Sequence, residues 1–340
     1  MTIHIGLIGG GNISGTHARA AAEIPNVKIS AVVGSNAAKV EALAHEHNAK
    51  SFTDLNAFLA HRPLDLVMIG SPSGRHADEG IAAAQRGLQV LTEKPLDVTT
   101  AKCDALIDAA EKAKVKLGVM FQDRTKPDII KLKKAIDRGD IGKPLLIDAR
   151  VRWYRPPEYY AGSKWRGVLA LDGGGALMNQ GVHTVDLLLW LFGDAKRVQS
   201  RIATSLHKIE AEDTALAILE FSGGALCTLQ ATTAAYPGYP RRVEITGTKG
   251  TIILEHDRIV AADIPNAPAD LLQSSTGDTN LSASSAVVSD VSGHKAVLED
   301  FLGAIETNGT PMCDGKEGRR SVALIEEIYR VARGAAVSGR

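Results

Sequence analysis

The amino-acid sequence predicts an α/β domain with a doubly wound parallel sheet, followed by an α+β domain with a large, mostly antiparallel open sheet and helices on one face. Strand-like and helical patterns alternate as far as about residue 122, which is typical of parallel βαβ units. Between residues 197 and 260 almost every segment is strand-like, and the short turns indicate antiparallel pairing. Because 340 residues favour two domains, we expect one over residues 1–122 and a second over residues 123–340.

The expected strands of the first domain are short apolar runs separated by helical patterns. These runs cover residues 3–8, 27–33, 65–70, 88–92 and 115–120. The helical patterns between them include residues 37–46, 76–86 and 101–112. Ligands of such a sheet bind at the carboxyl ends of its strands, so the loops after the strands hold the candidate site residues.

The second domain is expected to begin with a helix, a strand and a loop rich in Trp, Tyr, Arg and Pro, at residues 128–138, 145–152 and 153–166. A glycine-led helix follows and ends near residue 191. The later strands are expected at residues 197–206, 212–221, 224–233, 241–247, 250–255 and 258–261, and two helices at 294–306 and 316–333. One face of this sheet needs a cover, and a partner subunit is a common one, so we expect a homodimer or homotetramer.

The composition is that of a globular chain and argues against several classes of partner. The sequence holds 39 basic and 39 acidic residues, and this balance argues against nucleic acid or an anionic membrane as the main partner. The widely spaced Cys103, Cys227 and Cys313 indicate reduced thiols in a cytoplasmic protein and form no zinc pattern, so no metal site is expected. We find no signal-peptide pattern and no apolar run long enough to span a bilayer.

A glycine-rich turn lies between the first strand and an alanine-rich helical pattern. Residues 9–14 match the G-x-G-x-x-G dinucleotide fingerprint, with Ser14 in place of the third glycine. Glycine lets backbone N–H groups approach a pyrophosphate, and the helix N-terminus adds partial positive charge. The strand before this turn and the helix after it predict a Rossmann dinucleotide-binding domain. Its predicted cofactor contacts here are Gly9, Gly11, Asn12 and Ile13.

The second strand ends in Gly34-Ser35-Asn36, which bears on the choice between NAD and NADP. A carboxylate at this point binds the adenosine ribose of NAD and would repel the extra phosphate of NADP. Here there is none, and the small and hydroxyl residues Gly34 and Ser35 can accept that phosphate, with Lys39 one turn into the next helix. The sequence therefore favours NADP and leaves NAD open.

Two further strand ends carry polar motifs, Ser71-Pro72 with His76 and Glu93-Lys94-Pro95. A lysine beside a nicotinamide can hydrogen-bond a substrate hydroxyl, stabilise the developing alkoxide and relay its proton, so Lys94 is a candidate catalytic residue. A random lysine is more often a surface residue in a turn, but the strand end in a nucleotide-binding sheet favours catalysis. The cofactor contacts predicted from these segments and the end of the domain are Ser71, Pro72, His76, Glu93, Lys94 and Gln122.

The glycine-led helix carries Asn179, His183 and Asp186, whose spacing of four and three residues places them on one helix face. Polar groups on an apolar helix cost free energy unless they are paired or used. His183 can exchange protons near neutral pH and is the second candidate catalytic residue. Asn179 and Asp186 are expected to bind substrate, and Asp186 can also orient the imidazole. The alternatives are a buried histidine satisfied by Asp186 and a simple salt bridge of Asp186.

The loop before the glycines supplies basic and aromatic side chains. Arg166 can clamp a phosphate or a carboxylate, and Trp165 can stack on a sugar or nicotinamide face. The predicted substrate contacts in this loop are Tyr154, Tyr160, Lys164 and Arg166. Trp165 and Arg166 are also predicted to contact the cofactor. The alternatives are a packed aromatic ring and a solvated charge.

Together these motifs resemble the Gfo/Idh/MocA family of oxidoreductases over nearly the full chain. The resemblance is carried by Gly9-x-Gly11-Asn12-Ile13-x-x-x-His17, Ser71-Pro72-x-x-x-His76, Glu93-Lys94-Pro95, Gly173-Gly174-Gly175, Asn179 with His183 and Asp186, Glu212-Asp213-Thr214 and Gly247-Thr248-Lys249-Gly250-Thr251. It implies NAD(P)-dependent oxidation or reduction of a sugar, sugar nucleotide or cyclitol, and dimers or tetramers formed through the second domain. By motif position, Lys94 matches the family's catalytic lysine and His183 its catalytic histidine.

Two features of the sequence bear on the substrate. Asn179 stands where inositol dehydrogenases of the family carry an aspartate, which weakens a myo-inositol assignment. An amide cannot take a proton, so Asn179 should orient the substrate. The loop and residues 178–180 are similar to UDP-N-acetylglucosaminuronate 3-dehydrogenases of the family. Those enzymes typically bind NAD through an acid after the second strand, which this chain lacks.

The expected activity is hydride transfer between a nicotinamide cofactor and a secondary alcohol or ketone of a sugar, sugar derivative or sugar nucleotide. Two alternatives stay open. Some members of the family use tightly held NAD to cleave glycosides by transient oxidation and elimination. The other alternative is a non-catalytic cofactor-binding sensor.

Overall fold

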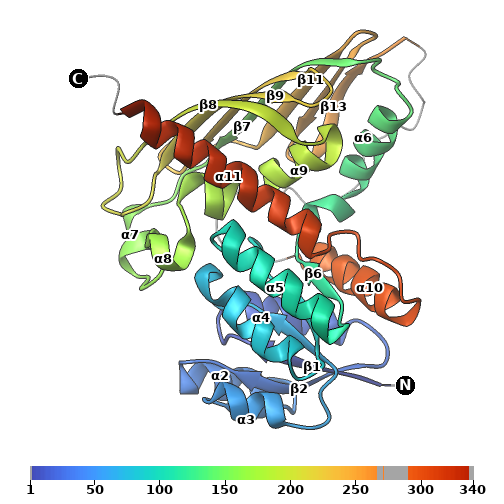
Figure 1. The fold of residues 1–340 in the computed structure, drawn as a ribbon, viewed down its shortest axis with the longest axis vertical. Coiled ribbons are helices and arrows are strands. Elements are labelled where there is room, and N and C mark those ends of the chain that lie inside the picture. Colours follow the sequence, from blue (N-terminus) through green and yellow to red (C-terminus); the bar gives the residue numbers. More distant parts are fainter. Residues whose placement is uncertain (1, 266–270, 272–289, 337–340) are drawn as a thin grey trace. The chain divides into compact units, whose positions relative to one another are not determined.

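The computed structural model describes residues 2–265, 271 and 290–336. The described residues form two compact units, one of residues 2–122 and 290–319 and one of residues 123–265, 271 and 320–336. Figure 1 traces the chain through its elements. The sequence predicts a second domain that is one continuous segment, residues 123–340. In the structure, residues 290–319 belong to the first unit instead.

The first unit holds a six-stranded parallel sheet in the order β3-β2-β1-β4-β5-β6. Its strands are β1 (Ile3–Ile8), β2 (Val27–Val33), β3 (Lys50–Phe52), β4 (Leu66–Ile69), β5 (Gln89–Thr92) and β6 (Leu117–Val119). Its helices are α1 (Asn12–Ala22), α2 (Ala37–Glu46), α3 (Leu55–Ala60), α4 (His76–Ala84), α5 (Thr100–Ala113) and α10 (Ser292–Glu306). The strand order reverses beside β1, which confirms the doubly wound sheet.

Two parts of this unit were not expected from the sequence. The edge strand β3 has three residues, too few to give a strand-like hydrophobic pattern. The helix α10 buries Val297, Leu298 and Phe301 in the core cluster that contains Ile5 and Leu7 of β1. This buried apolar face explains why α10 belongs to the first unit despite its late place in the chain.

The second unit holds a seven-stranded sheet in the order β13-β12-β11-β7-β10-β9-β8. Its strands are β7 (Pro144–Arg152), β8 (Ala195–Ala203), β9 (Thr214–Phe221), β10 (Leu226–Thr232), β11 (Arg242–Gly247), β12 (Thr251–Glu255) and β13 (Arg258–Asp263). Its helical elements are α6 (Pro127–Asp137), α7 (Pro157–Ala161), α8 (Leu169–Asp172), the π-helical turn η3 (Ala176–Gly181), α9 (Val182–Phe192) and, from Arg320 onward, α11 (Gly315–Ala336). All neighbouring strands are antiparallel except β7 and β10, which confirms the mostly antiparallel sheet.

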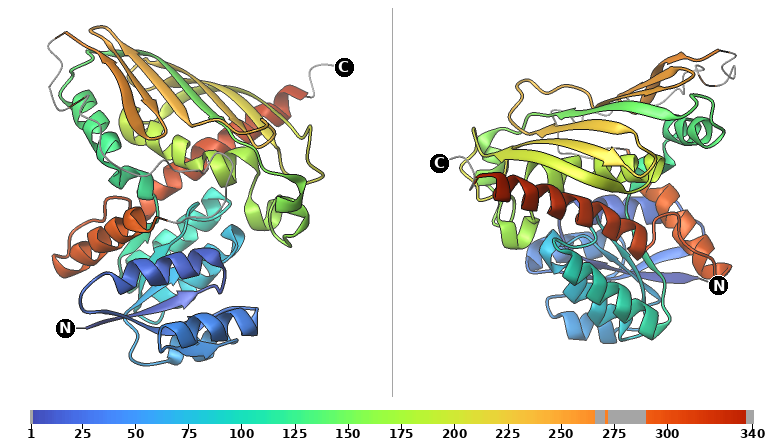
Figure 2. Two further views of the ribbon diagram at one scale, coloured as in Figure 1. Left: turned by 180° about the vertical axis from the view of Figure 1, so that it is seen from behind. Right: turned by 45° about the horizontal axis from the view of Figure 1, so that its top comes forward.

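This sheet has one covered face and one open face. Figures 1 and 2 show α9 and the end of α11 on the same side of it. Along β9 the residues alternate, with Ala217 and Leu219 buried and Leu216 and Ile218 about half exposed. Among the described residues, no helix has both the length and the apolar character needed to cross a bilayer.

Candidate active site

The glycine-rich turn leaves the N-terminus of α1 open to a ligand. Gly9 has a φ of 120°, and a Cβ atom there would lie 2.7 Å from the carbonyl oxygen of Gly70, so the turn requires glycine. Gly11 is the N-cap of α1, and no side chain caps the helix. Gly11 and Asn12 are exposed at this end and Ile13 is half-buried. The first N–H groups of α1 can therefore bind a phosphate, which fits the predicted dinucleotide.

The loop after β2 carries no carboxylate. Ser35 and Lys39 are exposed, and the Asn36 side chain caps α2 by accepting a hydrogen bond from the Lys39 N–H at 3.1 Å. A Cβ atom on Gly34 would lie 3.1 Å from Val40 Cγ2. A side chain at position 34 would therefore be crowded. The exposed side chain of Ser35 is unhindered and can approach a bound ribose.

The loop after β4 makes internal contacts. The Ser71 hydroxyl donates to Glu79 Oε2 at 2.5 Å. The His76 ring nitrogens lie 3.0 Å from the Ser71 carbonyl oxygen and 2.9 Å from that of Pro95. Because His76 is 1% exposed, it connects the loops after β4 and β5 in place of the expected cofactor contact. Pro72 and Ser71 remain half-buried.

Lys94 lies two residues after the end of β5, at the carboxyl edge of the parallel sheet, and is half-buried. Glu93 was expected to contact the cofactor, but its side chain makes internal contacts instead. It is 6% exposed, and its carboxylate accepts from His17 and from the Lys94 N–H. Burial alone would raise the pKa of Glu93, but His17 and His294 hold it well below its usual range. Gln122, the last residue before the second unit, is half-buried.

In the second unit, the glycine-led segment folds as α8, a π-helical turn and α9 instead of one α-helix. The Glu212 carboxylate accepts from the N–H groups of Gly175 and Leu177 at 2.9 and 2.7 Å and from the Tyr329 hydroxyl at 2.9 Å. A Cβ atom at Gly175 would lie 1.9 Å from the Glu212 carbonyl oxygen, so this close approach requires glycine. π-Helical turns are frequent at functional sites, and this one carries Asn179.

The side-chain amide of Asn179 is held on both sides. Its Nδ2 donates to Asp172 Oδ1 at 2.5 Å, and its Oδ1 accepts from Gln180 Nε2 at 2.7 Å. Gln180 accepts from Arg155 at 2.9 Å and donates to the Tyr159 hydroxyl at 3.1 Å. This chain of hydrogen bonds fixes the orientation of the Asn179 amide.

The His183 ring faces a carboxylate, but it is not that of Asp186. Nδ1 of His183 lies 3.9 Å from Asp123 Oδ2. Burial would raise the pKa of Asp123, but Arg241 and Lys126, each 2.6 Å from its carboxylate, hold it well below its usual range. Asp123 is therefore an ionised group beside the His183 imidazole.

Asp186 is a structural residue and does not make the expected substrate contact. It is 1% exposed, and its two carboxylate oxygens accept from the Arg124 guanidinium at 2.6 and 2.8 Å. Arg124 is equally buried, and its guanidinium lies 5.4 Å from the centre of the Trp190 ring. Asp186 and Arg124 thus form a simple salt bridge, which was the alternative to a substrate contact of Asp186.

Arg166 presents a guanidinium that no carboxylate of the described residues neutralises. It lies 4.2 Å from the centre of the Tyr159 ring and 5.3 Å from that of Trp165, and its buried Nε has no hydrogen-bond partner within the described part of the chain. The Arg155 guanidinium lies 5.6 Å from the same Tyr159 ring, and the exposed Lys164 adds a further positive charge. This loop is therefore suited to bind an anion.

The two tyrosines predicted to bind substrate differ in burial. Tyr160 is buried, its hydroxyl donates to Thr233 Oγ1 at 3.0 Å, and burial raises its pKa to about 12. Its role is packing, contrary to the expected substrate contact. Tyr154 is half-buried and meets the exposed Tyr236 edge-on, with ring centres 5.2 Å apart.

Comparison with known proteins identifies the family. Residues 3–121 match the oxidoreductase family with an NAD-binding Rossmann fold, GFO_IDH_MocA, and residues 129–253 match the GFO/IDH/MocA C-terminal domain. The chain belongs to the Gfo/Idh/MocA family. This Gfo/Idh/MocA protein is therefore an NAD(P)-dependent oxidoreductase, as the sequence predicts.

Several relatives of this family member match over most of its length. Inositol 2-dehydrogenase of Rhizobium meliloti (strain 1021) is 26% identical over 340 residues, 97% of each chain. D-Apiose dehydrogenase of Paraburkholderia graminis is 26% identical over 339 residues, 96% of this chain and 87% of that protein. The crystal structure of the WlbA dehydrogenase from Bordetella pertussis, in complex with NADH and UDP-GlcNAcA, matches with a TM-score of 0.90 and 32% identity over 98% of this chain and 96% of that one.

Three carboxylates fix or face other residues of the candidate site in this Gfo/Idh/MocA chain, and these roles were not predicted from the sequence. Asp172 fixes Asn179, Asp123 faces His183, and Glu212, known only as part of a motif, holds the glycine-led segment. Asp172 directly precedes the glycines, and this adjacency was the one local signal available. The other two contacts join segments far apart in the chain.

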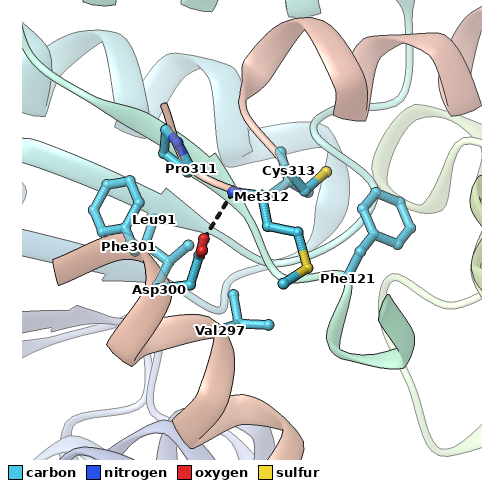
Figure 3. Close-up of a pocket in the computed structure, with 10 residues that line it drawn as sticks. Leu91, Phe121, Val297, Asp300, Phe301, Pro311, Met312 and Cys313 are labelled. Carbon is cyan, nitrogen blue, oxygen red and sulfur yellow. Dashed lines mark hydrogen bonds between the residues drawn. The ribbon is translucent and has the colours of Figure 1, made fainter. Parts of the chain in front are cut away.

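The first unit also contains a small apolar pocket. Figure 3 shows its lining, which includes Leu91, Phe121, Val297, Phe301 and Met312. The one carboxylate drawn there, of Asp300, accepts from the Met312 N–H at 2.7 Å. Because the lining is apolar and this carboxylate is engaged, we assign the pocket no ligand.

Proposed function

We propose that the protein transfers hydride between a nicotinamide cofactor and a secondary alcohol or ketone of a sugar derivative or sugar nucleotide that carries an anionic group. The anionic group is inferred from Arg166, whose guanidinium has no carboxylate partner within the described residues. Arg155 and Lys164 add positive charge to the same loop. Such groups recognise phosphate or carboxylate.

The relatives support a sugar or polyol substrate, and one of them supports an anionic one. One carries the name inositol 2-dehydrogenase, another the name D-apiose dehydrogenase, and the WlbA structure contains UDP-GlcNAcA. The last ligand carries a diphosphate and a carboxylate, which are the groups that an arginine-rich loop binds. Asn179, with its amide held by Asp172, favours this class over myo-inositol.

The roles follow from the chemistry of each residue. A nicotinamide dinucleotide would supply the hydride acceptor, and the glycine turn and the N-terminus of α1 would hold its pyrophosphate. In the oxidative direction His183 takes the hydroxyl proton, and the neighbouring Asp123 stabilises the resulting imidazolium. Lys94 stabilises the alkoxide that develops as hydride leaves carbon. Asn179 orients the sugar and Arg166 holds its anionic group.

The test is a screen of neutral sugars, cyclitols, sugar acids and UDP-sugars, followed by the nicotinamide absorbance. We expect turnover of an anionic member, and Arg166→Ala should lower its kcat/KM by about 10- to 100-fold, since hydrogen bonds to charged groups contribute about 1.5–3 kcal/mol. Arg330→Ala, which removes an exposed arginine paired with Glu327 on α11, is the matched control. A neutral sugar that is turned over equally well by the Arg166→Ala variant would contradict the anionic class.

We propose NADP as the preferred cofactor, because the end of β2 offers no carboxylate and exposes Ser35 and Lys39. Ser35→Asp should reverse this preference, lowering the affinity for NADP by roughly tenfold or more through repulsion of its ribose phosphate. The measurement is the Kd of each reduced cofactor by fluorescence titration. Ser35→Ala separates the loss of the hydroxyl from the gain of charge. Equal affinities of the unmodified protein for NAD and NADP would contradict the preference.

We propose that the open face of the second unit's sheet pairs two copies of the chain. Leu146, Leu216, Ile218 and Leu226, on the neighbouring strands β7, β10 and β9, are each about half exposed. An apolar patch of this kind marks an interaction site. Ile218→Lys should shift the molar mass measured by light scattering to that of a monomer, whereas Leu206→Lys, at an exposed leucine outside the sheet, should not. A monomeric unmodified protein would refute the pairing.

A further inference from the structure

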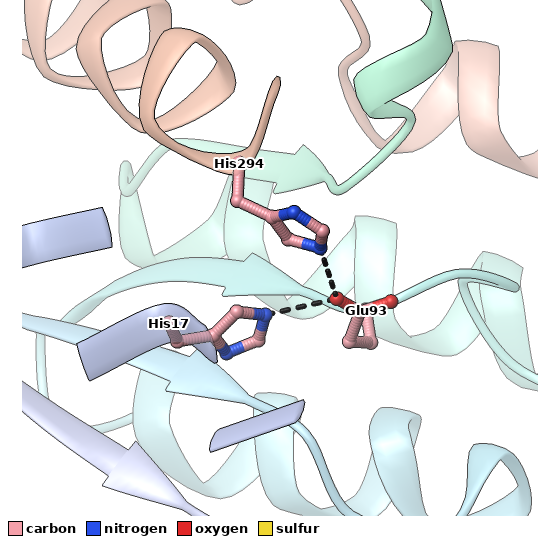
Figure 4. A group of neighbouring side chains, drawn as sticks. All are labelled: His17, Glu93 and His294. Carbon is pink, nitrogen blue, oxygen red and sulfur yellow. Dashed lines mark hydrogen bonds and ion pairs between the residues drawn. The ribbon is translucent and has the colours of Figure 1, made fainter. Parts of the chain in front are cut away.

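A carboxylate and two histidines meet in the interior of the first unit. His17 of α1, Glu93 after β5 and His294 of α10 are each at most 6% exposed. Glu93 Oε1 lies 2.8 Å from His17 Nε2 and 3.7 Å from His294 Nε2, as Figure 4 shows. Three elements that are far apart in the sequence thus converge on one oxygen atom.

These contacts fit hydrogen bonds better than a metal site. The three ligand atoms lie within 4.8 Å of one another, close enough to invite an ion. However, a histidine that binds a metal almost always donates its other ring N–H to a partner, and the buried Nδ1 of His17 has no hydrogen-bond partner within the described residues. A neutral His17 with its proton on Nε2 satisfies the cluster, because Nε2–H donates to the carboxylate and Nδ1 carries no proton.

The charges agree with this arrangement. Burial lowers the pKa of His17, which favours the neutral ring. Burial alone would raise the pKa of Glu93, but the hydrogen bond with His17 and the nearby His294 hold it well below its usual range. The cluster is therefore a carboxylate between two imidazoles.

The same carboxylate also holds the next residue. Glu93 Oε2 accepts from the backbone N–H of Lys94 at 3.2 Å, and the Glu93 N–H donates to the Ile69 carbonyl oxygen at 2.8 Å. The backbone that carries the Lys94 side chain is therefore fixed by an oxygen of the group that His17 and His294 hold. A change at His17 can reach Lys94 through two hydrogen bonds.

We propose that Glu93, held by His17 and His294, is a positioning residue for Lys94. The inference rests on the proposed catalytic role of Lys94. Removing the His17 donor frees the carboxylate to rotate, and the Lys94 backbone loses its anchor. A misplacement of about 1 Å in a catalytic group can cost about 100-fold in rate. We therefore expect kcat to fall while cofactor affinity is retained.

The test compares His17→Leu, which removes the donor, with His17→Gln, whose side-chain amide can still donate to Glu93. A spectroscopic readout follows Lys94 itself, by NMR of ¹³C-methylated lysines, with its resonance assigned from its loss in Lys94→Arg. We expect His17→Leu to move the Lys94 resonance and leave that of Lys102 in place, and His17→Gln to restore it. With the best substrate of the screen, kcat should fall about 10- to 100-fold in His17→Leu, and the Kd of the reduced cofactor should stay within about threefold.

Other outcomes overturn the proposal. A Lys94 resonance and a kcat that His17→Leu and Glu93→Gln both leave unchanged would show that the cluster does not position Lys94. A cofactor Kd that weakens in step with kcat would assign the cluster to the dinucleotide site, and one zinc ion per chain whose removal abolishes activity would make it a metal site. If His17→Leu does not fold, Glu93→Gln is compared with the unmodified protein by the same Lys94 resonance and kcat. A failure of the proposed function can be told apart from a failure of this inference. If the proposed function fails, Lys94→Ala retains full turnover. The NMR measurement of Lys94 tests the positioning by Glu93 independently of turnover.

Discussion

Replacing Lys94 or His183 by alanine will lower turnover by about 100- to 10,000-fold, the range that a positioned acid, base or charge-stabilising group contributes. In the proposed mechanism, Lys94→Ala removes the ammonium that would stabilise the alkoxide, and His183→Ala removes the proton acceptor next to Asp123. Neither change touches the glycine turn, so the Kd of the nicotinamide cofactor should stay within a few-fold. Steady-state kinetics and fluorescence titration separate the two quantities.

Exposed residues of the same types serve as controls for these variants. Lys112→Ala lies in α5 and His45→Ala in α2, both on the surface of the first unit. Both should retain the turnover of the unmodified protein. Full activity of Lys94→Ala and His183→Ala on the substrate would refute the proposed mechanism. Release of a leaving group without net reduction of the cofactor would point to glycoside cleavage instead.

Asp186→Ala will destabilise the protein by about 3–5 kcal/mol, because it leaves the buried Arg124 guanidinium without its carboxylate. This large effect reflects an uncompensated buried charge more than the value of the pair itself. The measurement is the free energy of unfolding by urea, monitored by circular dichroism.

Asp194→Ala is the matched control, since it also removes a carboxylate from an arginine of the second unit. Asp194 pairs with Arg320, but its side chain is 71% exposed, and such surface pairs contribute about 0–1 kcal/mol. If Asp186→Ala instead keeps its stability and raises only the KM of the substrate, the earlier expectation of a substrate contact is correct and the structural role is wrong.

The fold was predictable where signals are local and repeated. Alternation of apolar runs with helical patterns gave the parallel sheet, and the glycine turn between β1 and α1 gave the dinucleotide site. The edge strand β3 escaped because three residues carry no period. The placement of α10 escaped because an amphipathic helix shows that it has an apolar face but not which core that face enters.

The site was predictable as a set of residue types but not as a set of pairs. Asp186 has the right spacing to orient His183, and only the distant Arg124 shows that its carboxylate is already engaged. Asp123, which does face His183, lies in a four-residue 3₁₀ helix that is too short to give a periodic signal. Tyr160 and His76 have the polarity of ligand contacts, but burial decides their role, and burial depends on the whole fold.

The return of α10 to the first unit has a consequence for synthesis on the ribosome. Phe301 of α10 packs so closely against Gly118 of β6 that a Cβ atom there would lie 2.6 Å from its ring. The nascent Rossmann sheet therefore lacks part of its interior until residue 301 has left the exit tunnel, by which time the whole second sheet has been translated. The amino-terminal half is thus completed late, and truncation after residue 122 removes part of its own core together with the second unit.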